Sequence, residues 1–154
     1  MAKLKIVKIG NDILRQISRP VDSITPRIKT LIADMIETMH TADGCGLAAP
    51  QVGVLRRIAV VEVEPGSPIV LINPKIIARA GEQEGFEGCL SVPGKTGTVK
   101  RPMHVTVRAT DINGKQFEIS GSELTARAFC HEIDHLDGRL YIDIASEVHN
   151  NDKE

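Results

Sequence analysis

Hydrophobic positions along this chain repeat with the period of a helix in two segments and with the period of a strand in several others. The first helical segment has apolar residues on one face between residues 28 and 39. Thr25 and Pro26 precede it, a pair typical of an N-cap and the first helical position. The pattern predicts a helix to about Thr41, and the glycines of residues 43–46 are expected to end it with a left-handed exit.

Alternating apolar and polar residues predict strands at the N-terminus and through the middle of the chain. The predicted strands are Lys3–Ile9, Arg57–Val63, Ile69–Ile72, Lys75–Ala80, Met103–Thr110 and Lys115–Ser120. Asn113-Gly114 lies between the last two and is a strong hairpin signal, because both residue types accept the positive φ of a tight turn.

A second helix is predicted near the C-terminus, from a Ser122 cap to about Leu136, with Asp137-Gly138 as its end. The strands lie between two helices without a regular strand–helix alternation. This order favours an α+β fold, with mixed or antiparallel strands around the C-terminal helix and an N-terminal amphipathic helix. No repeat or linker interrupts the sequence, so residues 1–154 are predicted to form a single domain.

Composition narrows the function classes. The 154 residues are 42% hydrophobic and 25% charged with a net charge of −1, typical of a soluble globular protein and without the basic character of a nucleic-acid binder. No apolar run is long enough for a membrane span, and no signal peptide is recognised. The odd set of Cys45, Cys89 and Cys130 argues against a disulfide framework and for a thiolate ligand or buried thiol. We expect a cytoplasmic protein.

The most informative segment is 131–135 (HEIDH) on the second predicted helix. Residues four apart lie one above the other on a helix, so the imidazoles of His131 and His135 can share one divalent cation. Glu132 is turned away from that line and is expected to act as general base on a water rather than as a ligand. The competing interpretation is a helix with incidental or structural histidines, and the complete pattern on a capped helix favours the metal.

A catalytic site of this kind usually has three protein ligands. The position at which one metalloprotease class carries a third His is Tyr141 here, and no convincing carboxylate follows His135, so the third ligand is expected upstream. The candidates are Cys89, His104, Cys45 and the acidic residues. We prefer Cys89 for its soft thiolate and its turn-like, glycine-flanked setting, whereas His104 is expected on the solvent face of a strand.

Three segments together resemble the signature motifs of the peptide deformylase family. They are residues 44–51 (GCGLAAPQ), 87–91 (EGCLS) and 131–136 (HEIDHL), in the order of that family and at spacings it accepts. The resemblance covers essentially the whole chain, including the first helix and the hairpin. It implies a metal-dependent hydrolase that removes the N-formyl group from the formyl-methionine of newly made polypeptides and releases formate.

The resemblance also implies roles for the metal-site residues. Cys89, His131 and His135 match the metal ligands, and Glu132 matches the catalytic acid/base. The implied cofactor is one Fe²⁺ per chain, which Zn²⁺, Ni²⁺ or Co²⁺ can replace.

Further positions match the groups that contact the substrate. Gln51 matches a glutamine whose amide faces the reacting carbonyl, Leu90 a residue whose backbone N–H does the same, and Gly46 a backbone contact to an extended peptide. Leu124 and Ala128 lie on the helix stripe of the metal histidines and make that face apolar. The remaining expected wall of the substrate pocket is Cys45 and Gly88.

The partners implied are the N-formyl-methionyl peptide and, transiently, the ribosome. Residues 146–154 are a short polar tail, which argues against docking on the ribosome through a long C-terminal helix. Direct contact with nucleic acid or a membrane is not expected.

Several positions beside the motifs are interpreted from their setting. Cys45 replaces an aliphatic residue near the substrate pocket and should preserve it as a small hydrophobe, with altered preference or oxidation sensitivity. Cys130 stands where many relatives have Gln and is expected to point into the helix flank. Asp134 and Ser91 are interpreted as supporting or capping groups, and Arg101 either supports the structure or steers the peptide.

Two other functions compete with deformylation. A metallopeptidase of a different family would need a third ligand downstream of His135, and the sequence offers none that is convincing. A non-enzymatic metal-binding or redox-sensing module would need neither Glu132 nor Gln51, because ligation alone uses neither. Gln51 taken alone could also be a buried, satisfied amide.

Overall fold

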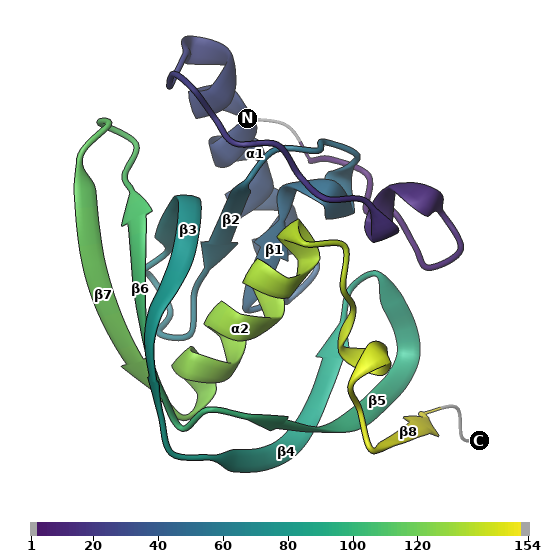
Figure 1. The fold of residues 1–154 in the computed structure, drawn as a ribbon. Helices are drawn as coiled ribbons and strands as arrows, with labels where there is room; N and C mark the ends of the chain where they lie inside the picture. Colours follow the sequence, from purple (N-terminus) through teal and green to yellow (C-terminus); the bar gives the residue numbers. More distant parts are fainter. Residues whose placement is uncertain (1–2, 152–154) are drawn as a thin grey trace.

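The computed structural model describes residues 3–151 as two helices, three short 3₁₀ helices and two antiparallel sheets (Figure 1). The helices are α1 (Pro26–Thr41), α2 (Leu124–Leu136), η1 (Asp12–Arg15), η2 (Ala49–Val52) and η3 (Tyr141–Asp143). The strands are β1 (Gly46–Ala48), β2 (Ile58–Val61), β3 (Ile69–Ala80), β4 (Gln83–Cys89), β5 (Val92–Arg101), β6 (His104–Thr110), β7 (Gln116–Ser122) and β8 (Glu147–Asn150). The larger sheet has the order β1-β2-β3-β6-β7 and the smaller one β4-β5-β8. This confirms the α+β fold.

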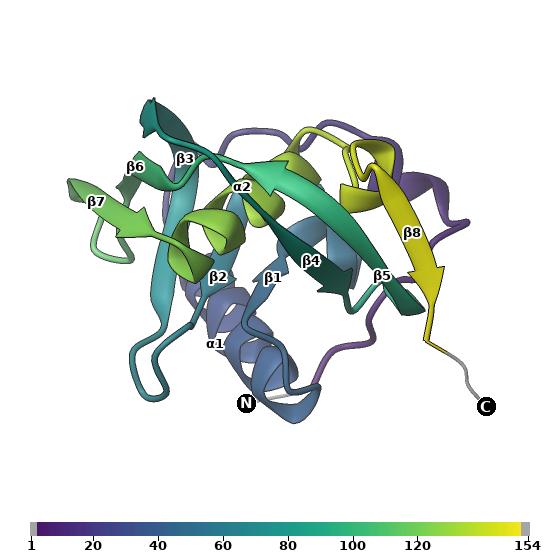
Figure 2. The ribbon, with the colours of Figure 1, turned by 90° about the horizontal axis from the view of Figure 1, so that it is seen from below.

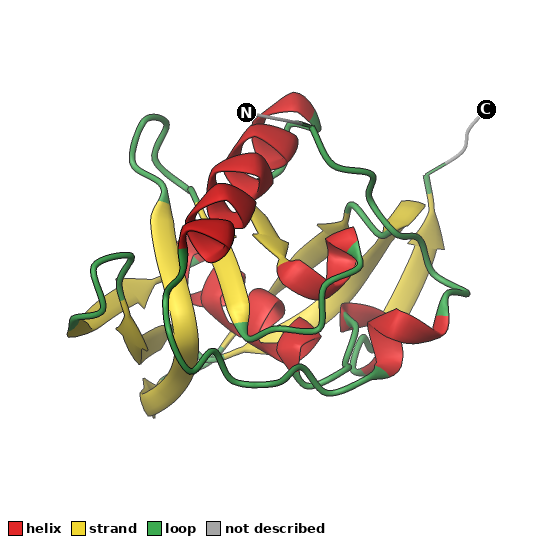
Figure 3. Ribbon diagram, turned by 90° about the horizontal axis from the view of Figure 1, so that it is seen from above, coloured by secondary structure: helices red, strands yellow, loops and turns green. Residues whose placement is uncertain are grey.

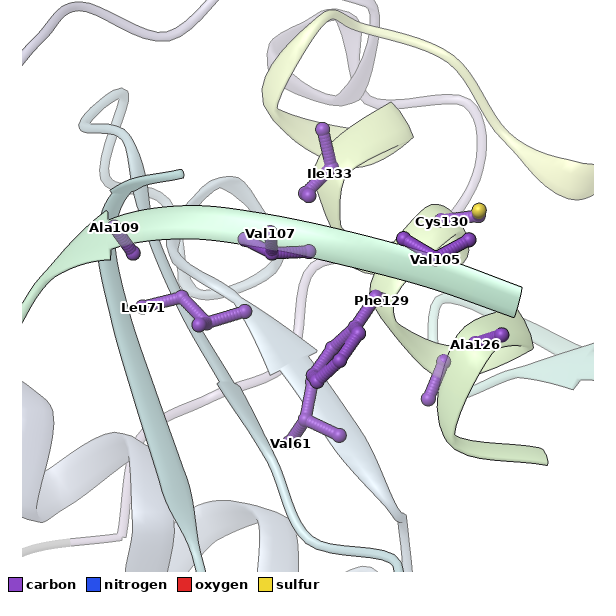
Figure 4. Close-up of a cluster of buried hydrophobic side chains, with 10 residues drawn as sticks. Val61, Leu71, Val105, Val107, Ala109, Ala126, Phe129, Cys130 and Ile133 are labelled. Carbon is purple, nitrogen blue, oxygen red and sulfur yellow. The ribbon is translucent and has the colours of Figure 1, made fainter. Parts of the chain in front are cut away.

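The larger sheet is covered by a helix on each face, and α2 lies between the two sheets (Figures 1, 2 and 3). The alternation along β2 decides which side chain meets which helix. Ile58 and Val60 pack with Met35 of α1, whereas Val61 packs with Phe129 of α2 (Figure 4). Within the described residues, neither helix has the length and apolar character needed to cross a membrane.

The prediction for α1 is confirmed at its start and corrected at its end. The Thr25 hydroxyl accepts a hydrogen bond of 3.2 Å from the N–H of Ile28, which caps the first turn. The helix ends at Thr41 as expected, but the residue with the left-handed conformation after it is Asp43 (φ 57°), not a glycine. Aspartate is among the few non-glycine residue types that accept this conformation readily.

The predicted Ser122 cap of α2 is wrong. Ser122 ends β7, and its hydroxyl lies 2.7 Å from Nδ1 of His104 on the neighbouring strand. The helix follows Glu123, which has φ 56° and makes no side-chain cap. The helix therefore begins directly after the turn at Glu123, without a capping side chain. The predicted end is confirmed, because the helix stops at Leu136 and Gly138 follows with a φ of 77°. A Cβ on Gly138 would lie 2.5 Å from the backbone carbonyl oxygen of Arg15.

The predicted N-terminal strand at residues 3–9 is also wrong. The segment is extended but belongs to neither sheet. The N–H of Val7 donates to the carbonyl of Gln51 at 2.7 Å, and that of Ile9 donates to the carbonyl of Ser91 at 2.8 Å. The segment therefore ties together two parts of the chain that lie 40 residues apart.

The predicted strands Ile69–Ile72 and Lys75–Ala80 are one continuous strand, β3. Asn73 and Pro74 interrupt the alternation in sequence, and the structure places a register shift there. The Asn73 side chain hydrogen-bonds both backbone groups of Val21, at 2.8 and 2.9 Å. A bulge accommodates the proline, which has no N–H to donate, so the strand continues beyond it.

The smaller sheet was not predicted at all, because glycines interrupt the alternation along β4 and β5, and β8 lies in the short polar tail. Two of these glycines allow close approach rather than a turn: a Cβ on Gly85 would lie 3.1 Å from the Arg127 guanidinium, and one on Gly97 would lie 2.8 Å from the Tyr141 ring. The tail also supplies a strand, β8, which pairs with β5. Residues 152–154 lie outside the described part of the chain.

We predict that Phe129→Ala lowers the free energy of unfolding by about 3–5 kcal/mol, because it opens a cavity between α2 and the larger sheet. Denaturant unfolding followed by circular dichroism measures this. Ile17→Ala is the control, because that side chain is 71% exposed and its loss should change stability by less than about 0.5 kcal/mol. Equal stability of the two variants would contradict the packing described here.

Candidate metal centre and active site

The structure brings together a thiol and two imidazoles from distant parts of the chain. Cys89 is the last residue of β4, and its Sγ lies 3.3 Å from Nε2 of His135. A ligand atom of His131 completes a group whose members all lie within 4.8 Å of one another. His104 is exposed on β6, as expected for the solvent face of a strand, and does not join the group. The group can hold one metal ion.

The donors fit a first-row divalent cation in chemistry as well as in spacing. Both histidines are nearly inaccessible on α2, where the interval of four residues aligns their rings. Nδ1 of His131 hydrogen-bonds Glu87 at 2.9 Å, which leaves Nε2 of that ring available to an ion. A mixed thiolate–imidazole set suits Fe²⁺ and Zn²⁺ alike.

The Glu87 carboxylate is the centre of a buried network of charges next to the candidate metal ligands. One oxygen accepts from Arg101 at 3.0 Å and from His131 at 2.9 Å. The other accepts from the same Arg101 side chain at 2.8 Å and from Arg127 at 2.8 Å. These donors come from β5 and α2, so the carboxylate joins β4 to both elements.

The network keeps the Glu87 carboxylate in its charged form. Burial by itself would raise the pKa of Glu87, but the hydrogen bonds from Arg101 and His131 outweigh it and lower that pKa to about 2. Arg101 also donates to Asp134 at 2.7 Å. Arg101 is 5% exposed and forms ion pairs with two carboxylates. Of the two roles considered for it, supporting the structure therefore fits better than steering the peptide. Asp134 supports it in turn, as expected.

Glu132 has the opposite environment to Glu87. It is buried, and its Oε1 has no hydrogen-bond partner among the described residues. Burial raises the pKa of Glu132 to about 7, with the charge of Glu87 adding to the effect and that of His131 opposing it. A Cβ on Gly46 would lie 2.9 Å from Cδ of this carboxylate, so the glycine makes room for it. The result is a buried carboxylate with a free oxygen beside the candidate metal ligands.

The Gln51 amide is held from both ends. Its oxygen accepts from the N–H of Ala48 at 2.9 Å, and its nitrogen donates to the Ser91 hydroxyl at 3.1 Å. The same nitrogen lies 3.5 Å from Sγ of Cys89. The amide N–H₂ is therefore fixed in direction and lies beside the candidate ligand Cys89. Ser91, fully buried, has the supporting role expected for it.

A cavity of about 390 Å³ opens beside these groups. It is lined by Cys45, Gly46, Gln51, Gly88, Cys89, Leu90, Leu124, Ala128, His131 and Glu132. Every residue predicted for the site from sequence thus borders this cavity, apart from His135, which is buried next to Cys89. Cys45 is exposed in the wall, and Cys130 is buried in the core beside Val105, as expected for the helix flank (Figure 4).

Five residues that border the cavity were not among the predicted site residues: Asp43 and Gly44 after α1, and Phe86, Glu87 and Arg127. Among the last three, two had a signal. Glu87 lies two residues before Cys89, which is the spacing of one strand face, and Arg127 lies four residues before His131, on the same face of the helix. Phe86 had none, because the strand that carries it was not predicted.

A candidate cation site with a free carboxylate beside it, on an α+β scaffold, is the arrangement of a metal-dependent hydrolase. The comparisons with known proteins agree. The family model for polypeptide deformylase matches residues 3–151. A peptide deformylase from Lachnoclostridium phytofermentans is 56% identical over 152 residues, which are 97% of this chain and 93% of that one.

Solved structures give the same result. A peptide deformylase from Legionella pneumophila has a TM-score of 0.91 and 46% identity, over 94% of this chain and 87% of that one. Another from Synechococcus elongatus, in complex with actinonin, has a TM-score of 0.91 and 40% identity, over 96% of this chain and 81% of that one. The chain belongs to the peptide deformylase family, the metalloenzymes that remove the N-formyl group from nascent polypeptides. The expected family and activity are confirmed.

We predict that Glu87→Gln weakens metal binding by about 10- to 100-fold, because His131 loses its charged partner. The free energy of unfolding should fall by about 3–5 kcal/mol, because two buried arginines lose their shared carboxylate. Competition with a metal-sensitive dye and denaturant unfolding measure the two effects.

The matched control is Glu118→Gln. It also breaks a Glu–Arg pair, with Arg108, but both side chains are about half exposed. Its stability and metal affinity should be those of the unmodified chain. If the two variants bound the metal equally well, Glu87 would have no role in orienting His131.

Proposed function

We propose that this chain hydrolyses the formamide bond of N-formyl-methionyl peptides with Cys89, His131 and His135 as metal ligands and Glu132 as acid/base. The observation that carries the assignment of roles is the contrast between two buried carboxylates. Both oxygens of Glu87 are engaged, whereas Glu132, which borders the cavity, keeps one oxygen without a partner among the described residues. A general base requires such a free oxygen.

The proposed resident metal is Fe²⁺, one per chain, with Zn²⁺, Ni²⁺ or Co²⁺ as substitutes. A divalent cation at this site would supply a Lewis acid, which lowers the pKa of a nearby water and polarises the formyl carbonyl. A neutral Nε2 on each imidazole and a Cys89 thiolate would be its donors. The metal would also favour the charged form of Glu132 and so prepare it to accept a proton.

The residues of the chain account for the remaining steps. Glu132 takes a proton from the attacking water as the C–O bond to the formyl carbon forms. Negative charge develops on the formyl oxygen, where the fixed Gln51 amide and the backbone N–H of Leu90 donate to it; one such donor is worth roughly 3–4 kcal/mol. Glu132 then returns the proton to the leaving amine as the C–N bond breaks. The products are formate and a free N-terminus.

The cavity suits an extended peptide. Among the described residues, β1 pairs only with β2, and β4 pairs only with β5, so each has an edge without a strand partner. Gly46 on β1 and Gly88 on β4 both line the cavity. We therefore propose that the substrate backbone lies along these two edges and that its methionine side chain enters the wall formed by Cys45, Leu124 and Ala128.

We propose a cytoplasmic location with transient contact to the ribosome, where formylated N-termini emerge. Three free cysteines, one of them exposed, fit a reducing compartment.

The first test is formate release from N-formyl-Met-Ala under anaerobic conditions with Fe²⁺. The unmodified chain should turn over, and Glu132→Gln should reduce kcat by about 10²- to 10⁴-fold, because it removes the proton carrier. Metal content, measured by elemental analysis, should stay at one per chain because Glu132 is not a ligand. A variant that kept full activity, or lost its metal, would contradict the assigned role.

The second test concerns the ligands. His135→Ala, or prolonged chelation of the unmodified chain, should remove both the metal and the activity, and added Fe²⁺ should restore only the chelated chain. His104→Ala is the matched control, because that imidazole is exposed and remote from the group of ligands. Loss of metal in the control, or its retention in His135→Ala, would mean that the ligands were assigned wrongly.

A further inference from the structure

An aromatic side chain lies at the rim of the cavity with most of its surface exposed. Phe86 on β4 is 72% exposed and borders the cavity, as does Leu124, which is 52% exposed. The Phe86 ring lies edge-to-face with the ring of His149 on β8, with centroids 6.4 Å apart and an interplanar angle of 79°. Phe86 of β4 and Leu124 of α2 thus form an apolar rim of the cavity, and His149 lies against the Phe86 ring.

The alternation of β4 determines which part of a substrate can reach this rim. Glu87 points inward to Arg101 and His131, so Phe86 and Gly88 face the opposite, outer side of the strand. A peptide paired to the free edge of β4 alternates in the same way. If its first side chain enters the cavity, its second side chain lies on the outer face.

On that outer face Gly88 has no side chain, so Phe86 is the residue of β4 that the second side chain of the peptide would contact. Diagonal neighbours across paired strands are separated by about 7–8 Å, which an aromatic side chain can span. Packing against His149 limits the positions open to the Phe86 ring. The Phe86 ring therefore has a neighbour on β8 before any peptide binds.

We propose that Phe86, supported by His149, is a specificity-determining residue that favours an apolar or aromatic side chain at the second position of the formylated peptide. The inference rests on the proposed function, because it requires the peptide to lie along the edge of β4. The contact is remote from the reacting bond and is present before and during the reaction. It should therefore act mainly on KM and little on kcat.

The test compares formate release from N-formyl-Met-Phe-amide and N-formyl-Met-Ser-amide. The unmodified chain should prefer the phenylalanine peptide in kcat/KM, and Phe86→Ala should reduce this preference by about three- to tenfold. The loss should appear in KM for the phenylalanine peptide, and kcat/KM for the serine peptide should change little. His149→Ala should reduce the preference by a smaller factor, and Phe86→Leu should retain part of it.

Ile17→Ala is the matched control, because it removes a side chain that is equally exposed, at 71%, and does not border the cavity. Its preference should equal that of the unmodified chain. An unchanged preference in Phe86→Ala would overturn this inference and leave the proposed function intact. Failure of the unmodified chain to hydrolyse either peptide would overturn the proposed function and this inference with it.

Discussion

The site depends on a carboxylate that is buried and fully hydrogen-bonded. Glu87 receives donors from Arg101 on β5 and from Arg127 and His131 on α2, so a single side chain sets the position of the smaller sheet against the helix. Cys89 follows two residues later on the same strand. The distance between its thiol and the two imidazoles is thereby fixed by a network of charges beneath them.

The same network separates the roles of two glutamates. In a buried site a carboxylate with four donors is stabilised in its charged form, as the pKa of about 2 for Glu87 indicates. The Glu132 carboxylate, whose Oε1 has no partner among the described residues, is not stabilised in this way, and burial raises its pKa to about 7. In the proposed mechanism, one group orients a metal ligand and the other keeps an oxygen free for proton transfer. Their environments, rather than their chemical nature, assign them different functions.

The two sheets explain how a peptide can reach this buried chemistry. Among the described residues, each sheet has one edge strand without a strand partner beside the cavity, and under the proposed function the glycines at these edges let a substrate backbone approach. Gly46 has a second effect, because its missing Cβ leaves space for the Glu132 carboxylate.

The sequence by itself determined the local features: the extent of α1, the end of α2, the hairpin at Asn113-Gly114, and the helical spacing that aligns His131 with His135. These follow from residues close together in the chain. The tertiary structure alone decided the network around Glu87 and the smaller sheet, in which glycines interrupt the alternation along β4 and β5. Only long-range packing joins groups that are 40 residues apart, such as Glu87 and Arg127. Neither the hydrophobic periodicity nor the capping residues of the sequence indicate which carboxylate a buried arginine contacts.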